Sequence, residues 1–157
     1  MKIRNLQAKD RAAIKELLIN TAVFKDIEVD CGLELIDLAL GNPAQEDYYF
    51  LVAVSEDDKA LGYICYGKTP LTDAVYDLYW IAVKPSSHRK NIGENLLKRM
   101  EELLKNENAR MVLAETSSLP HYEAARNFYK KNGFSVVSEV FDFYSVGDNK
   151  ITFRKDL

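Results

Sequence analysis

The residues of this sequence with the clearest chemical potential form a basic turn, HRKNIG, at positions 88–93. The turn follows an apolar, β-rich run at residues 78–83 and Pro85, and it precedes a stretch with apolar residues at helical spacing. A helix that opens directly after a strand presents backbone N–H groups without internal partners, at the positive end of its macrodipole. This arrangement predicts a site for a phosphate or pyrophosphate group.

The side chains of the turn favour the same chemistry. His88, Arg89 and Lys90 supply hydrogen-bond donors and positive charge. Asn91 and Gly93 permit close approach of the backbone, because Gly lacks a Cβ atom and Asn tolerates a positive φ. We therefore expect the backbone of this turn to cradle a pyrophosphate. A solvated basic turn without a ligand is the alternative interpretation.

The composition is that of an ordinary globular protein and limits the possible functions. The chain has 157 residues, 47% apolar and 29% charged, which suits one domain around one core. With 21 Lys and Arg against 24 Asp and Glu, the net charge of −3 argues against a nucleic-acid partner. No signal peptide or membrane span is predicted. Cys31 and Cys65 lie in unrelated segments, so neither a disulfide framework nor a metal site is expected, and we expect a cytoplasmic protein.

The order of elements predicts a single α+β (mixed α/β) domain over residues 1–157. Strands are expected at residues 2–6, 48–55, 61–67, 78–83, 110–115, 134–146 and 150–153. Helices are expected at residues 8–21, 33–40, 92–104 and 121–132. Residues 24–31 mix charged and apolar side chains and are expected to form a loop, and residues 147–149 a turn. The pattern predicts one mostly antiparallel, twisted central sheet flanked by helices.

Two segments resemble motifs of the GCN5-related N-acetyltransferase (GNAT) family. IAVKPSSHRKNIGENLL, at residues 81–97, is similar to motif A, in which V-x-P is followed by Arg or Gln, two residues, Gly, one residue, and Gly or Ala. EAARNFYKKNGF, at residues 123–134, resembles the family's helix that carries Ala, then Tyr, then the Gly-Phe that starts the next strand. His88 stands at the Arg or Gln position, Asn91 at the first Gly position, and Tyr122 where the family often has Asn. With IRNLQAKDRAAI similar to the opening strand and helix, the resemblance spans nearly the whole chain.

The resemblance implies an acyl-CoA-dependent N-acyltransferase with acetyl-CoA (coenzyme A) as co-substrate and no metal. The pyrophosphate would lie on the basic turn and the helix that follows. The pantetheine arm would run as a pseudo-strand beside residues 78–83, which splay away from the strand at residues 111–115. The cofactor-binding residues that the resemblance implies are Ile81, Ala82, Val83, His88, Arg89, Lys90, Asn91, Ile92, Gly93, Glu94 and Tyr122.

Acyl transfer to an amine needs a base for the amine and an acid for the departing thiolate. Tyr129 matches the family's tyrosine that protonates the thiolate, and a phenol with a pKa of about 10 stays protonated at neutral pH. Asp77 matches the position of the base in histone-type members, and strict alternation would place it on the strand face of Ile81 and Val83. Glu115 is the rival, and a structural role or a water chain is the alternative to both. Neither cysteine has a basic neighbour that would activate it, so direct attack in a ternary complex is expected.

The acceptor amine, a small molecule or a peptide, is not identified by any motif. The segments expected to shape its site contribute acidic and aromatic side chains: Glu28, Asp30, Asp73, Phe141, Asp142, Phe143 and Tyr144. Such a rim suits a cationic amine, and scattered surface residues are the alternative. A non-catalytic acyl-CoA sensor is the alternative function, since it needs the basic turn but neither Tyr129 nor a carboxylate. We expect a monomer or homodimer without nucleic-acid or membrane partners.

Overall fold

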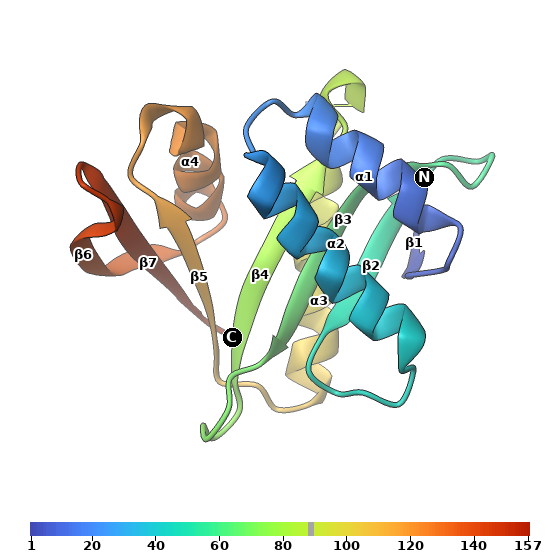
Figure 1. Cartoon of the computed structure of the whole chain (residues 1–157). Coiled ribbons are helices and arrows are strands. Elements are labelled where there is room, and N and C mark those ends of the chain that lie inside the picture. Colours follow the sequence, from blue (N-terminus) through green and yellow to red (C-terminus); the bar gives the residue numbers. More distant parts are fainter. Residues whose placement is uncertain (88–89) are drawn as a thin grey trace.

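The computed structural model describes residues 1–87 and 90–157 as seven strands in one sheet, with helices on both faces (Figure 1). The strand order is β1-β2-β3-β4-β5-β7-β6, and every neighbouring pair is antiparallel except β4–β5. The strands are β1 Lys2–Asn5, β2 Tyr49–Val54, β3 Ala60–Lys68, β4 Val75–Val83, β5 Met111–Ser117, β6 Ser135–Ser145 and β7 Asp148–Asp156. The helices are α1 Asp10–Asn20, α2 Asp26–Gly41, α3 Ile92–Asn106 and α4 Glu123–Lys131, with short 3₁₀ turns η1 Pro85–Ser87 and η2 Pro120–Tyr122. The predicted mixed fold with a mostly antiparallel sheet is confirmed.

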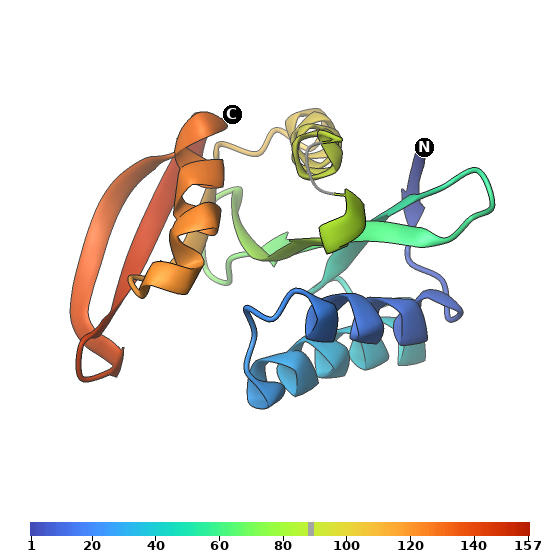
Figure 2. The ribbon, with the colours of Figure 1, turned by 90° about the horizontal axis from the view of Figure 1, so that it is seen from above.

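The helices divide between the two faces of the sheet (Figure 2). Helices α1 and α2 lie side by side on one face, where Ile14, Leu18 and Ile36 are fully buried. Helix α3 packs on the other face through Leu97 and Met100, as its helical spacing predicts, and α4 joins the same apolar cluster. In the described part of the chain, no helix is long and apolar enough to cross a membrane.

Helix α2 is longer than the sequence pattern indicated. Residues 24–31, expected as a loop, lie mostly within α2. The helix starts there because Glu28 accepts the backbone N–H of Lys25 at 2.8 Å, and because acidic residues in the first turn complement the helix dipole. Its buried positions are Val29, Gly32, Leu33 and Ile36. Their spacing is helical and could have indicated the longer helix, but the charged residues between them make the pattern hard to recognise.

Strands β6 and β7 form a hairpin at one edge of the sheet (Figure 1). Val146 and Gly147 join them, with Gly147 at a φ of 83°, which favours glycine. The sequence pattern placed the turn at residues 147–149, but Asp148 already belongs to β7. Asp148 is only 5% exposed, whereas every residue of β6 is exposed.

Candidate functional site

The sheet opens between its two central strands. Strand β4 pairs with β5 only through its first four residues, ending at Leu78. On the β3 side, Tyr79 is an extra residue between two residues that pair with consecutive residues of β3. Such a β-bulge bends its strand, which explains why β4 and β5 separate from this point. The splayed strands expected from the family resemblance are present.

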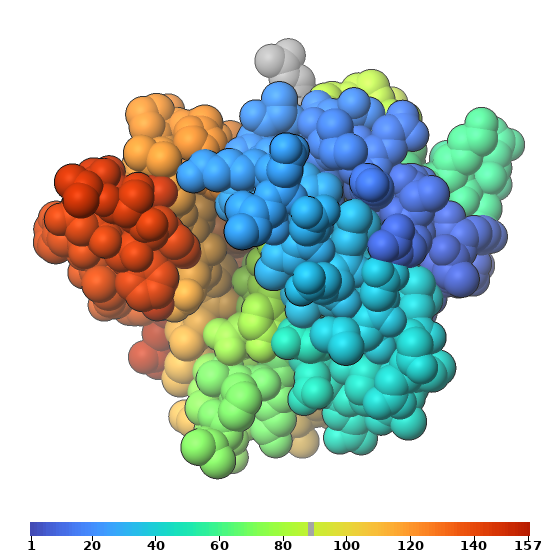
Figure 3. Space-filling view, viewed as in Figure 1, coloured from blue at the N-terminus to red at the C-terminus, as the bar shows by residue number. Residues whose placement is uncertain are grey.

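A cavity of about 800 Å³ occupies this opening. Its walls come from β4 beyond the bulge, the start of α3, the end of β5, η2 and α4, the α1–α2 connection and the β6–β7 hairpin. In Figure 3 a recess separates the hairpin and α4 from helices α1 and α2. Of the cofactor-binding residues expected from the sequence, it is lined by Ile81, Ala82, Val83, Asn91, Ile92, Gly93, Glu94 and Tyr122. The fold therefore brings most of these predicted residues into one cavity.

The N-terminus of α3 borders the cavity, and no side chain of the described residues caps its first backbone N–H groups. Asn91 is the N-cap residue, at φ 54° and ψ 22°, and its side chain makes no capping hydrogen bond. It thus supplies the left-handed conformation that the turn requires. A Cβ atom added to Gly93 would lie 3.2 Å from the Phe128 ring, so this position is also sterically tight. Lys90 is exposed, whereas His88 and Arg89, also expected here, lie outside the described residues.

Tyr129 is the aromatic residue expected to act as an acid, and it lies on α4 at the border of the cavity. Its ring is 6% exposed and packs with Phe128, Phe134 and Phe153 at centroid distances of 5.2–5.8 Å. Burial raises the pKa of the Tyr129 phenol above its ordinary value. The phenol therefore stays protonated at neutral pH and can donate a proton or a hydrogen bond.

Asp77 is not on the strand face that alternation predicted. The bulge shifts the period by one residue, so that Leu78 joins Ile81 and Val83 in the cluster beneath α3. Asp77 does not line the cavity, and its carboxylate accepts the Thr69 hydroxyl at 2.7 Å. The expectation that Asp77 shares a face with Ile81 and Val83 was therefore wrong.

The two candidate carboxylates differ in their surroundings. Burial raises the pKa of Asp77, the Thr69 hydrogen bond opposes this, and the negative charge of Glu115 adds to the rise. Glu115 lies at the open end of β5, lines the cavity and forms an ion pair of 3.0 Å with Lys150. The rival carboxylate is thus the one that borders the cavity.

Two further residues that line the cavity are joined by a hydrogen bond. The Tyr122 hydroxyl donates to Glu28 Oε1 at 2.7 Å, which links η2 to the first turn of α2. Burial raises the pKa of Tyr122, and the Glu28 hydrogen bond adds to the rise. Its hydroxyl is therefore engaged with a residue of the α2 wall. Of the other acidic and aromatic residues expected at the rim, Tyr144 lines the cavity, whereas the following do not: Asp30, Asp73, Phe141, Asp142 and Phe143.

Asp148 is a cavity residue that sequence reasoning missed. Its carboxylate accepts a short hydrogen bond from the Ser117 hydroxyl at the end of β5. The residue looked like part of a solvated turn, because Gly147 and Asn149 flank it. No local pattern distinguishes such an aspartate from one that a hairpin folds inward.

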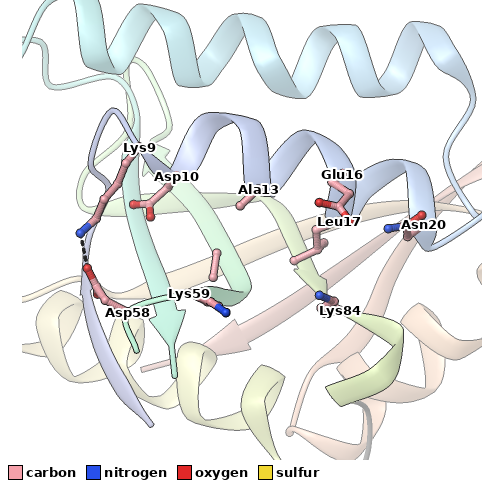
Figure 4. Close-up of a pocket in the computed structure, with 10 residues that line it drawn as sticks. Lys9, Asp10, Ala13, Glu16, Leu17, Asn20, Asp58, Lys59 and Lys84 are labelled. Carbon is pink, nitrogen blue, oxygen red and sulfur yellow. Dashed lines mark hydrogen bonds and ion pairs between the residues drawn. The ribbon is translucent and has the colours of Figure 1, made fainter. Parts of the chain in front are cut away.

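A second cavity, of about 280 Å³, lies between α1 and the β2–β3 turn (Figure 4). Three of its six charged side chains pair within the fold: Lys9 bonds Asp58, and Asp10 accepts two hydrogen bonds from Arg4. No residue expected to be functional lines it. In the described ranges, 1–87 and 90–157, no group of three or more His, Cys, Asp or Glu side chains could hold a metal ion. We therefore place the candidate site in the larger cavity.

Comparisons with known proteins agree with this architecture. Among solved structures, a Desulfovibrio desulfuricans protein assigned to the GNAT family shares 35% identity at a TM-score of 0.92, over 99% of this chain and 98% of that one. PaiA N-acetyltransferase from Thermoplasma acidophilum, in complex with coenzyme A, shares 20% identity at a TM-score of 0.77, over 99% and 98%. A GNAT-family acetyltransferase from Staphylococcus aureus shares 18% identity at a TM-score of 0.78, over 99% and 98%. The last two likenesses concern the fold alone, and no curated protein matches the chain.

A family model also matches the amino-acid sequence itself. The model described as the acetyltransferase (GNAT) domain matches residues 46–136, more than half of the chain. This range contains the bulged strand, the basic turn, α3 and α4. Together with the relative at 35% identity, it shows that the chain belongs to the GNAT family of acetyltransferases.

Proposed function

We propose that this protein transfers an acetyl group from acetyl-CoA to an amine, by direct attack in a ternary complex. The observation that carries the proposal is the single cavity that joins an uncapped helix N-terminus, a bulged strand and a buried tyrosine. The helix N-terminus suits a pyrophosphate, the bulged strand suits a pantetheine arm, and the tyrosine suits a departing thiolate. The coenzyme A complex of the PaiA enzyme, which has the same fold, supports the choice of co-substrate.

The residues present fit the co-substrate. The backbone N–H groups of Ile92, Gly93 and Glu94, which no described side chain caps, suit an anion at the positive end of the helix dipole. A Cβ atom at position 93 would crowd the Phe128 ring, so glycine fits this position best. Residues 81–83, beyond the end of the β4–β5 pairing, would hold the pantetheine amides. The bound thioester supplies the acyl group.

Tyr129 and a carboxylate would move the protons. The Tyr129 hydroxyl would donate its proton to the coenzyme A sulfur as the amine displaces it, since burial keeps the phenol protonated. Glu115 would accept the proton of the acceptor ammonium, directly or through one water. We favour Glu115 over Asp77 because Glu115 lines the cavity and Asp77 does not. Removal of the ammonium proton is required because a lysine-like amine has a pKa of about 10.4.

A thiol-release assay tests the proposal. Purified protein with acetyl-CoA and a panel of amines should release coenzyme A faster with at least one amine than without any. Calorimetry on the same protein should show binding of coenzyme A. Binding without release for every amine would instead favour the non-catalytic sensor, and the absence of binding by folded protein would contradict both functions.

A further inference from the structure

Part of the cavity wall is acidic. Besides Glu94 on α3, which pairs with Lys131, three carboxylates line the cavity, from Glu28 on α2, Glu115 on β5 and Asp148 on β7. Glu115 forms an ion pair with Lys150 at 3.0 Å. Among the described residues, no lysine, arginine or histidine forms an ion pair with Glu28 or Asp148. Two carboxylates of the cavity wall thus have no ion-pair partner among the described residues.

Asp148 is the more unusual of the two, because it is a buried carboxylate with no ion-pair partner in the described ranges. It is 5% exposed, and one oxygen, Oδ1, accepts the Ser117 hydroxyl. That hydroxyl also accepts the Leu119 backbone N–H at 3.0 Å, so its own hydrogen points to Asp148. A single hydroxyl donor replaces only part of the hydration of a carboxylate, and burying most of a charge without a cation beside it is costly. A cation entering the cavity would offset this cost.

Glu28 is held in place so that its charge faces the same space. Oε1 accepts the Tyr122 hydroxyl at 2.7 Å, and Oε2 accepts the Lys25 backbone N–H at 2.8 Å. Each carboxylate oxygen has a second lone pair, so both can still accept from a ligand. Tyr144 lies within the field of both carboxylates, since the pKa of its phenol is raised first by burial and then by Glu115, Asp148 and Glu28.

Aromatic rings complete this part of the cavity. Phe24 and Trp80 pack against each other with centroids 5.1 Å apart, and both line the cavity with Tyr144. Ring faces attract cations and also cover aliphatic carbon. The wall therefore offers both kinds of surface that a charged alkyl amine presents.

We propose that the acceptor is an amine with a second cationic group, and that Glu28 and Asp148 bind this second group while the first amine attacks the thioester. The inference rests on the proposed function and narrows its substrate to a class. The aliphatic spacer would lie against Phe24 and Trp80. A monoamine lacks the group that would neutralise the two carboxylates, so it would bind more weakly.

The test compares amines of equal carbon skeleton that differ by one ammonium group. Putrescine against butylamine is one pair, and cadaverine against pentylamine is a second. We expect kcat/KM to be about ten- to a hundredfold higher for the diamine of at least one pair, because a close charge pair that is shielded from water changes affinity by about this factor. In Asp148→Asn and Glu28→Gln this ratio should fall towards one. Glu34→Gln, an exposed carboxylate on the same helix, is the matched control and should keep the ratio.

The outcomes separate this inference from the proposed function. Equal use of monoamines and diamines by the unaltered protein would overturn the inference and leave the transferase intact, as would an unchanged ratio in both variants. If no amine is acetylated, calorimetry of putrescine into coenzyme A-loaded protein decides the matter: binding weakened tenfold by Asp148→Asn supports the subsite, and no binding overturns it. Melting curves check that each variant is folded. If Asp148→Asn does not fold, the comparison is made with Glu28→Gln alone.

Discussion

Asn91 offers the sharpest test of how the phosphate site works. At φ 54° it is left-handed, and its side chain makes no capping bond, so we attribute its role to backbone conformation alone. The left-handed conformation costs an ordinary L-residue about 1–2 kcal/mol of conformational free energy, whereas it costs glycine almost none. Asn91→Ala should therefore lower the free energy of unfolding by about 1 kcal/mol, and Asn91→Gly should leave it nearly unchanged.

The same strain should appear in ligand binding. If Ala shifts the turn away from the conformation that aims the first N–H groups of α3, about 1 kcal/mol of strain weakens coenzyme A binding roughly fivefold. Asn91→Gly should bind within about twofold of the unaltered protein by calorimetry. Equal weakening by both substitutions would refute the reasoning, because it would mean that the Asn91 side chain itself contacts the ligand.

Four further predictions concern individual side chains and glycines of the fold. Tyr129→Phe should lower the rate of thiol release by about a hundredfold or more while coenzyme A affinity, measured by calorimetry, is kept, and an unchanged rate would remove Tyr129 as the acid. Glu115→Gln should reduce this rate more than Asp77→Asn, and the reverse order would restore Asp77 as the base. Because burial raises the pKa of Asp77, the folded state holds this proton more tightly and stability falls as the pH rises above the unfolded pKa of about 3.9, so Asp77→Asn should raise Tm more at pH 7 than at pH 3. A Cβ atom at Gly67 would lie 1.9 Å from a backbone oxygen, so Gly67→Ala should cost about 2 kcal/mol or more in urea denaturation, whereas Gly41→Ala, with nothing within 4 Å, should not destabilise.

The parts of this fold that local patterns determine could be predicted from the sequence. Helix α3 shows an uninterrupted helical spacing, and its buried residues Ile92, Leu96 and Met100 are those that the spacing selects. The basic turn between a strand and a helix likewise identified the α3 end of the cavity. In both cases the signal lies within one or two turns of chain, where periodicity and turn chemistry act directly.

The features that depend on pairing between distant strands could not be predicted. The bulge at Tyr79 follows from the register with β3, so alternation placed Asp77 on the wrong face. Asp148 is buried because the hairpin folds back on Ser117, a contact across 31 residues. Glu28 meets Tyr122 across 94 residues. The proposed acceptor side of the cavity depends on such long-range contacts, which explains why local sequence patterns indicated the proposed cofactor side more clearly.

The central claim is that backbone amides at the start of α3 hold the diphosphate of a coenzyme A thioester beside the opened strand β4. Titration of uniformly ¹⁵N-labelled protein with coenzyme A, followed by amide chemical shifts, tests it most directly. The largest changes should fall on the backbone amides of residues 91–94, with smaller changes at residues 81–83. Saturable shifts confined to the cavity of Figure 4, or no shifts at all, would contradict the account.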